Sequence, residues 1–316
     1  MSRPYIENRY ATDEEWAEAR KGGIGGSDVA SIMGINPYSS PLEVWLVKTG
    51  RAESPDLSGK ESVEWGNRLE PLVAEKFAEG HPELKVRRKN CTMASVSRPW
   101  AFANIDRELR GPDGSHGVLE IKTVGSRRSS DWDDGVPAYY MTQVQHYLSV
   151  TGWGFAWVAV LIGGQEYREF LVPRDEEDIA AIDSAVDAFW NEYVAKDVMP
   201  QIVGTDSESR ALFDQHQSDD GEYEYEADYP LLQTRVALKE ELDAKSAELK
   251  QIDNEIKARI GDAKGIEDAS LRATWVRTES AQFDKASFQA DNPELYAKYM
   301  VRKPKDMGLR FKKMEV

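Results

Sequence analysis

The chain has 316 residues, of which 41% are hydrophobic and 30% charged, and a formal net charge of −16. This composition provides for a packed core in one large domain or two smaller ones, and it excludes wholesale disorder. The negative charge argues against a general nucleic-acid coat but leaves a nuclease open, because metal ions supply positive charge at the phosphate. Cys91 is the only cysteine, which excludes an internal disulfide and a cysteine-ligated iron–sulfur cluster. No apolar run could span a bilayer and no signal sequence is evident, so we expect a cytoplasmic protein without membrane contacts.

The N-terminal region is predicted to contain two short helices joined by glycines. Thr12 is a typical cap for a helix that carries Arg20. The connection from Lys21 to Ser27, KGGIGGS, lacks the Gly-Lys-Ser/Thr ending of a nucleotide-binding P-loop, which excludes that motif. Ser27 lies at or near the start of the second helix, where free N–H groups can hold a phosphate. A plain loop with a capping serine is the alternative interpretation.

Two further helices are predicted before the first strands. One covers 41–49, and a longer one begins near Ser62 and contains Pro71, which either kinks or restarts it. The apolar residues of the longer helix recur at the helical period and predict one buried stripe: Leu69, Leu72, Val73 and Phe77. Glu70 lies off this stripe, where an ordinary solvated glutamate would also lie.

The stretch from 103 to 123 is predicted to form two strands joined by a glycine-rich polar turn. Asp106 closes the first strand. The second strand carries Glu120 and Lys122, which share a face because side chains alternate along a strand. An acid and a lysine on one strand, beside a carboxylate from its neighbour, can hold a divalent cation and a polarised water. A surface salt bridge on a strand pair is the alternative.

A polar segment and a helix follow the second strand. The segment, 124–135, is predicted to be flexible. Its two arginines are Arg127 and Arg128. The helix extends from Pro137 to Gly152 and carries Tyr140 and Gln143.

An apolar strand over 155–162, a returning strand over 167–172 and a helix over 175–198 complete the predicted core. The order of helices and strands predicts an α/β fold with a central mixed sheet flanked by helices.

Three regions are expected along the chain. The core covers 1–202, an acidic linker covers 203–230, and a C-terminal extension covers 231–316. The extension starts with a long helix whose apolar residues recur at close to heptad spacing, which is typical of a coiled coil. Its basic end is either a solvated tail or a nucleic-acid contact.

The order of these parts resembles the PD-(D/E)xK nuclease superfamily. More closely, it is similar to the YqaJ-type viral recombinase and phage lambda exonuclease family, over about residues 16–198. The matching stretches are Arg20 through Ser27-Asp28, Trp65-Gly66 through Glu70, Ile105-Asp106, Leu119-Glu120-Ile121-Lys122, and Pro137 through Tyr140, Gln143 and Gln145. Ile105 replaces the proline of the superfamily motif, and that proline is not a ligand.

The resemblance implies roles for individual residues. One or two Mg²⁺ ions, for which Mn²⁺ is expected to substitute, would be bound by Glu70, Asp106, Glu120 and the backbone carbonyl of Ile121. Lys122 would orient or deprotonate the attacking water, with support from Gln143. A terminal 5′-phosphate would be held by Arg20 and Ser27, since arginine forms bidentate phosphate contacts. Further DNA contacts are expected from Arg127, Arg128 and Tyr140.

The predicted function is a Mg²⁺-dependent exonuclease that resects linear double-stranded DNA ends 5′→3′ for phage-type recombination. The resemblance implies a ring-shaped homotrimer, a single-strand annealing protein as partner, and a phage or prophage protein in the cytoplasm of a bacterial host. An endonuclease on the same fold and a non-catalytic DNA-binding or assembly module are the alternatives. The clustered carboxylates argue against the module, because a surface that only binds DNA has no need of acids facing it.

Overall fold

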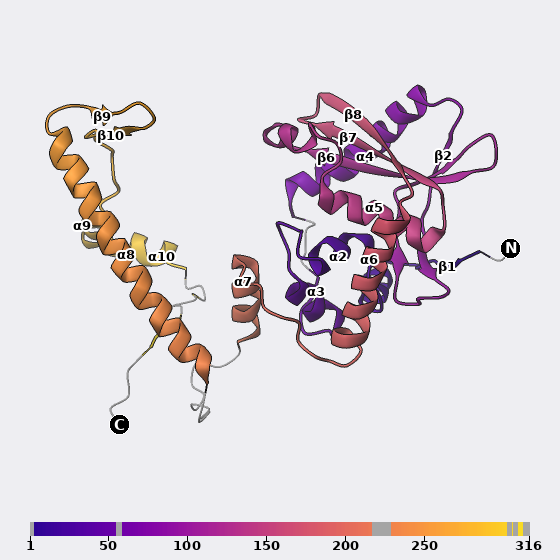
Figure 1. The fold of residues 1–316 in the computed structure, drawn as a ribbon, viewed down its shortest axis with the longest axis horizontal. Helices are drawn as coiled ribbons and strands as arrows, with labels where there is room; N and C mark the ends of the chain where they lie inside the picture. The colour runs from indigo at the N-terminus through magenta and orange to yellow at the C-terminus, as the bar shows by residue number, and fades with distance from the viewer. Residues whose placement is uncertain (1–2, 55–58, 217–228, 302–304, 306–308, 312–316) are drawn as a thin grey trace. The chain divides into compact units, whose positions relative to one another are not determined.

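A five-stranded mixed sheet forms the centre of the N-terminal part of the chain in the computed structural model (Figure 1). The strand order is β2-β5-β6-β7-β8, in which β6 and β7 are parallel and the other neighbours are antiparallel. The strands are β2 (Lys85–Arg88), β5 (Arg107–Arg110), β6 (His116–Val124), β7 (Phe155–Ile162) and β8 (Glu166–Pro173). The structure describes residues 3–54, 59–216, 229–301, 305 and 309–311. The predicted α/β core with a central mixed sheet is confirmed.

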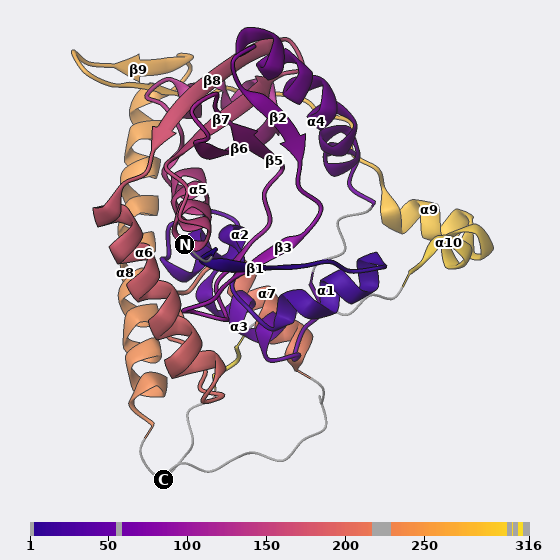
Figure 2. The same ribbon diagram turned by 90° about the vertical axis from the view of Figure 1, so that its right-hand side faces the viewer.

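One long helix covers each face of this sheet (Figures 1 and 2). The two helices are α4 (Glu61–Gly80) and α5 (Ala138–Thr151). Leu119 of β6 packs in one apolar cluster with Phe77 of α4, and Val118 packs in a second cluster with Val144 of α5. Because side chains alternate along β6, Glu120 and Lys122 lie on the α5 side.

The apolar stripe of α4 differs from the prediction in one residue. Val73 and Phe77 are buried, but the side chain of Leu72 is 58% exposed. Pro71 lies inside α4, which continues through it from Glu61 to Gly80. The helix therefore buries a narrower face than its apolar residues indicate.

A group of four shorter helices lies beside α5, and the second and fourth of them pack directly against it. They are α1 (Asp13–Lys21), α2 (Gly26–Ile32), α3 (Pro41–Lys48) and α6 (Glu176–Ala188), which continues as a π-helical turn over Phe189–Val194. A three-stranded sheet also lies here, formed by β1 (Tyr5–Asn8), β3 (Thr92–Ser95) and β4 (Phe102–Ala103). The predicted cap is confirmed, since the Thr12 side chain accepts a hydrogen bond from the Glu15 N–H.

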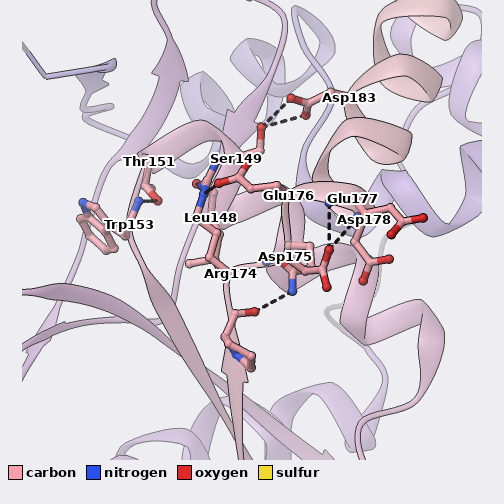
Figure 3. A network of polar contacts seen from close by, with 12 residues as sticks. Leu148, Ser149, Thr151, Trp153, Arg174, Asp175, Glu176, Glu177, Asp178 and Asp183 are labelled. Atoms are coloured by element: carbon pink, nitrogen blue, oxygen red, sulfur yellow. Dashed lines mark hydrogen bonds and ion pairs between the residues drawn. The ribbon is translucent and has the colours of Figure 1, made fainter.

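Polar contacts fix α6 to the end of α5 (Figure 3). The Ser149 hydroxyl lies 2.7 and 2.9 Å from the two carboxylate oxygens of Asp183. Asp175 caps α6 by accepting from the N–H groups of Glu177 and Asp178 at 2.9 and 3.1 Å. These contacts fix the start of α6 and join that helix to the end of α5.

Two predicted local structures differ from the structure. Asp106 does not close a strand but lies in the bend just before β5. The segment 124–135, predicted to be flexible, contains a 3₁₀-helix over Ser126–Trp132. Trp132 is only 1% exposed and stacks on Phe170 of β8, so burial of one aromatic ring orders this polar segment.

The chain divides into two units, Met1–Gln217 and Ser218–Val316. The first part of the predicted acidic linker belongs to the first unit, because it forms α7 (Asp206–Gln215). Glu208 is 1% exposed, and one of its carboxylate oxygens accepts from three backbone N–H groups, at 3.0, 2.6 and 3.2 Å. The acidic composition of this segment predicted an exposed linker. The segment instead forms a helix, because an acid whose carboxylate accepts hydrogen bonds from backbone N–H groups can be buried. The rest of the predicted linker, 217–228, lies outside the described residues.

The second unit contains the predicted long helix, α8 (Pro230–Ile260). Its other elements are β9 (Gly265–Glu267), β10 (Arg272–Thr274), α9 (Lys285–Asp291) and α10 (Pro293–Tyr299). The heptad-spaced side chains of α8 are exposed from Leu238 to Ile256, whereas Ile260 is buried. Of the predicted basic end, Arg302, Lys303, Lys312 and Lys313 lie outside the described residues. No helix in the described parts of the chain is long and apolar enough to cross a membrane.

Candidate active site

The register of β5 and β6 brings two carboxylates side by side. Arg107 of β5 pairs with Leu119 of β6, so Asp106, one residue earlier, comes opposite Glu120. Asp106 Oδ2 accepts a hydrogen bond of 2.8 Å from the backbone N–H of Ile121. This bond fixes the Asp106 carboxylate at the edge of β6 although Asp106 itself lies outside the strand.

Glu120, Lys122 and Gln143 form a closed triangle of hydrogen bonds. Lys122 Nζ donates to Glu120 Oε1 at 2.6 Å and to Gln143 Oε1 at 3.2 Å. Gln143 Nε2 donates to Glu120 Oε1 at 2.9 Å and to the Tyr147 hydroxyl at 2.8 Å. Gln143 and Tyr147 are four residues apart on α5 and therefore share the face that looks at β6. The structure thus joins the predicted Glu-x-Lys pair to the predicted glutamine.

Burial and mutual repulsion perturb the charges of this group. Burial, reinforced by the negative charge of Glu120, raises the pKa of Asp106 to about 8. Burial disfavours the charged form of Lys122, but the Glu120 carboxylate outweighs this and raises the pKa of the ammonium above its usual value. Glu120 Oε2 is buried and has no hydrogen-bond partner. The site therefore has more negative charge than its own donors satisfy.

Glu70 approaches the site from α4, on the other face of the sheet. Its Oε1 accepts a hydrogen bond of 2.5 Å from Arg107 Nη1, which also donates to the backbone carbonyl of Asp106 at 2.8 Å. Glu70 is close enough to contribute to the raised pKa of Asp106. Arg107 thus holds the Glu70 carboxylate next to the bend that carries Asp106.

The donor set fits a hard divalent cation. The unpartnered Glu120 Oε2 and the destabilised carboxylate of Asp106 are oxygen donors of the kind that Mg²⁺ prefers, and a cation would relieve both. No three His, Cys, Asp or Glu side chains among the described residues are arranged as a metal-binding group. The predicted ligand set of Glu70, Asp106, Glu120 and the Ile121 carbonyl therefore stays a prediction, with Glu70 paired to Arg107 instead.

The two residues predicted to hold a terminal phosphate are also brought together. Arg20 lies in the last turn of α1, and its Nη2 donates to the Ser27 hydroxyl at 3.3 Å. Ser27 is the second residue of α2 and is exposed. The guanidinium of Arg20 also lies 4.9 Å from the ring centre of Trp16.

The remaining predicted DNA-binding residues follow the end of β6. Arg127 is exposed. Arg128 lies 5.0 Å from the ring centre of Tyr38, a side chain that is 57% exposed. Tyr140 is half-buried, stacks on Trp132, and has the Lys122 ammonium 4.6 Å from its ring centre. Tyr140 therefore contacts the site lysine directly, which its predicted role as a DNA contact did not include.

Three residues with clear roles in the site were not predicted. Arg107 follows Asp106 directly, and strand alternation could have placed it on the α4 side. Tyr147 lies four residues after Gln143 and therefore on the same helix face, but its hydrogen bond to that residue has no sequence signal. Lys48, at the end of α3, pairs with Asp28 at 2.8 Å, and this contact joins residues that are 20 positions apart in the chain.

Comparison with known proteins places the chain in a family. Residues 15–154 match the YqaJ-like viral recombinase domain. Protein YqaJ of Bacillus subtilis (strain 168) is 31% identical over 298 residues, which cover 92% of this chain and 92% of that protein. Protein D345L of African swine fever virus (strain Badajoz 1971 Vero-adapted) is 24% identical over 161 residues, 44% of this chain and 45% of the viral protein.

Solved structures also align with the chain. An alkaline exonuclease (LHK-Exo) from Laribacter hongkongensis aligns over 64% of this chain and 100% of its own, with 19% identity and a TM-score of 0.47. The Bacillus protein matches over nearly the full length of both chains, and the family domain includes Arg20, Ser27 and the whole acidic site. The predicted family is therefore confirmed: this chain belongs to the YqaJ-like viral recombinase family.

Proposed function

We propose that this protein is a metal-dependent deoxyribonuclease that degrades linear double-stranded DNA from its 5′ ends. The observation that carries the proposal is the buried Glu120–Lys122–Gln143 triangle beside Asp106, with one carboxylate oxygen left unsatisfied. A buried carboxylate oxygen without a hydrogen-bond partner costs stability, and such groups concentrate at functional sites. Membership of a recombinase family supports an activity that processes DNA ends.

Each residue of the site has a proposed role in phosphodiester hydrolysis. Asp106, Glu120 and Glu70 would hold a divalent cation, which lowers the pKa of bound water and offsets charge at the phosphate. Lys122, whose Nζ contacts both Glu120 and Gln143, would orient the attacking water and, as the neutral amine that a nearby dication favours, would accept a proton from it. Gln143 keeps the carboxylate of Glu120 and the amine of Lys122 at a fixed separation.

Glu70 requires a change of partner in this proposal. In the structure its Oε1 is bound by Arg107 at 2.5 Å. A cation at the site would compete with the guanidinium for this carboxylate, so Arg107 serves as the counter-ion of Glu70 before the cation binds. A partly buried glutamate without any cation beside it would cost stability, and Arg107 offsets that cost.

The direction of digestion follows from the second pair of residues. Arg20 and Ser27 provide a guanidinium and a hydroxyl 3.3 Å apart, which suits the oxygens of a terminal 5′-phosphate. Holding that phosphate would place the first internucleotide linkage at the acidic site. By resemblance to the phage enzymes, we also propose a ring-shaped homotrimer and a single-strand annealing protein as partner, with Mg²⁺ as the metal and Mn²⁺ as its substitute.

The test is digestion of DNA with each strand end-labelled, using linear duplex and closed circles, with and without Mg²⁺. We expect loss of nucleotides from 5′ ends of linear DNA only. Glu120→Gln and Lys122→Ala should each lower the rate by at least about a hundredfold, as removal of a catalytic group commonly does. Glu79→Gln is the matched control, because Glu79 is an exposed α4 residue paired only with Lys76.

The outcomes separate the alternatives. Cutting of closed circles would select an endonuclease on the same fold. Wild-type rates in both Glu120→Gln and Lys122→Ala would refute the site. If the protein binds duplex DNA but neither degrades it nor binds Mg²⁺ or Mn²⁺ in calorimetry, the non-catalytic module is correct.

A further inference from the structure

One buried lysine contacts both helices that carry the candidate phosphate-binding residues. Lys48, the last residue of α3, has a side chain that is only 3% exposed. Its Nζ donates to the backbone carbonyl of Arg20 at 2.9 Å and pairs with Asp28 Oδ2 at 2.8 Å. Arg20 lies in the last turn of α1 and Asp28 in the first turn of α2. Lys48 therefore bridges the end of one helix and the start of the next.

The connection between these helices needs such a bridge. Residues 22–25 are Gly-Gly-Ile-Gly, and glycines leave the backbone free to take many conformations. Ile24 is fixed to a neighbouring strand by two backbone hydrogen bonds, with Trp100 at 2.6 Å and Phe102 at 2.8 Å. Those bonds hold the middle of the connection, and at its ends the Gly22 N–H donates to the Ala19 carbonyl at 3.1 Å and the Asp28 N–H donates to the Gly25 carbonyl at 2.9 Å. Lys48 and Asp28 hold the ends, since Asp28 Oδ2 also accepts from the Gly25 N–H at 2.9 Å.

Lys48 also compensates the negative charge of Asp28 beside the candidate phosphate site. Asp28 lies one residue after Ser27, and an uncompensated carboxylate there would repel a phosphate. Burial would raise the pKa of Asp28, but the ammonium of Lys48, helped by Arg20, lowers it, so Asp28 stays ionised and paired. The pair leaves the Arg20 guanidinium free of a carboxylate partner in the described structure, where its polar side-chain contact is the Ser27 hydroxyl.

We infer that Lys48 is the positioning residue of the 5′-phosphate site: by binding the Arg20 carbonyl and the Asp28 carboxylate together, it sets the spacing of the Arg20 and Ser27 side chains that recognise the phosphate. This inference rests on the proposed function, because it assigns a determinant of end recognition to the same enzyme. Lys48 does not contact the DNA, since its ammonium is buried and its contacts are within the protein.

The experiment compares the full-length protein with Lys48→Met and with Lys48→Met/Asp28→Asn on duplexes that carry a 5′-phosphate or a 5′-hydroxyl. The double variant removes both charges, so it avoids a buried unpaired carboxylate and separates folding from positioning. The side-chain carbonyl of the introduced asparagine can still accept the Gly25 N–H. Lys76→Met is the control, because Lys76 is an exposed α4 lysine that pairs with Glu79. Steady-state rates give KM and kcat for each end, and thermal melting gives stability.

Wild type and Lys76→Met should show a KM at least about tenfold lower for the phosphorylated end, the size of one or two charge-assisted hydrogen bonds. In Lys48→Met/Asp28→Asn the KM for this end should rise until the preference is about twofold or less, while the kcat on the hydroxyl end is unchanged. Single Lys48→Met should lose the preference and also melt at a lower temperature.

A double variant that is folded and keeps the tenfold preference would overturn the inference, whatever its melting temperature, because Lys48 would then not position the residues that recognise the phosphate. Equal KM values for the two ends in wild type would also overturn it, together with the phosphate site. Absence of any degradation by wild type is a different result, since it would refute the proposed nuclease itself.

Discussion

A single methyl group added at Gly26 should disturb the candidate active site through Tyr147 and Gln143. A Cβ at this position would lie 2.5 Å from Tyr147 Cε1 and 3.0 Å from Gln143 Cγ. Tyr147 is only 4% exposed, so its ring has no open space to move into. Because an approach of 2.5 Å forces the ring to shift, the cost lies in the upper part of the overpacking range, about 2–3 kcal/mol. The better helix propensity of alanine returns at most about 1 kcal/mol. We therefore expect Gly26→Ala to lower the free energy of unfolding by about 1–2 kcal/mol.

Displacement of Tyr147 should shift the Glu120 carboxylate through two hydrogen bonds. The Tyr147 hydroxyl accepts from Gln143 Nε2, which also donates to Glu120 at 2.9 Å. A shifted Tyr147 moves Gln143 and with it the carboxylate, and positioning errors near a site commonly cost about tenfold or more in rate. Urea denaturation measures the stability, and initial rates on linear duplex at a temperature where the variant is folded measure the chemistry.

The control for Gly26→Ala is Gly154→Ala, where a Cβ meets nothing within 4 Å. This variant should keep both the stability and the rate. A double-mutant cycle with Tyr147→Leu sharpens the test, because the smaller side chain removes the clash and the effect of Gly26→Ala should then nearly vanish. If Gly26→Ala matches wild type in urea midpoint and rate, the close packing of α2 on α5 is refuted.

Three further predictions concern buried polar groups. Gln143→Leu removes donors from Glu120 and should lower the rate on linear duplex by about 10–100-fold, measured beside Gln145→Leu. Glu208→Gln weakens the contacts with three N–H groups and should cost about 1–3 kcal/mol in urea denaturation, with Asp214→Asn as the exposed control. Asp28, whose pKa lies below its usual value near 4 because Lys48 outweighs burial, stabilises the fold above that pH. Its contribution should disappear as the pH falls through the lowered pKa, and a melting series of Lys48→Met/Asp28→Asn should lack that component.

The parts of the site that the sequence predicts are those set by local periodicity. Alternation along a strand places Glu120 and Lys122 on one face, and the predicted pair of strands brings the Asp106 carboxylate beside them. This pattern depends on a few neighbouring residues, so no knowledge of the fold is required. The resemblance to a nuclease family then added Gln143 to these residues.

The parts that were missed depend on contacts between distant segments. Asp106 was expected at the end of a strand, but its position is decided by the Ile121 N–H, which a propensity argument does not include. The pairing of Glu70 with Arg107 depends on which face of the sheet α4 covers. The helix over 206–215 was missed because an acidic segment is typical of a linker, whereas here backbone donors allow Glu208 to be buried.

The parallel pairing of β6 and β7 has a consequence for how the site comes into being during folding. Parallel neighbours require a crossover, and α5 is that crossover. Glu120 and Lys122 lie on the first strand and Gln143 on the crossover, so one contiguous strand–helix–strand segment assembles all three in a single docking event. Backbone amides of β6 should consequently be among the slowest in the molecule to exchange with deuterium, and any species that has lost this protection has lost its reaction centre as well.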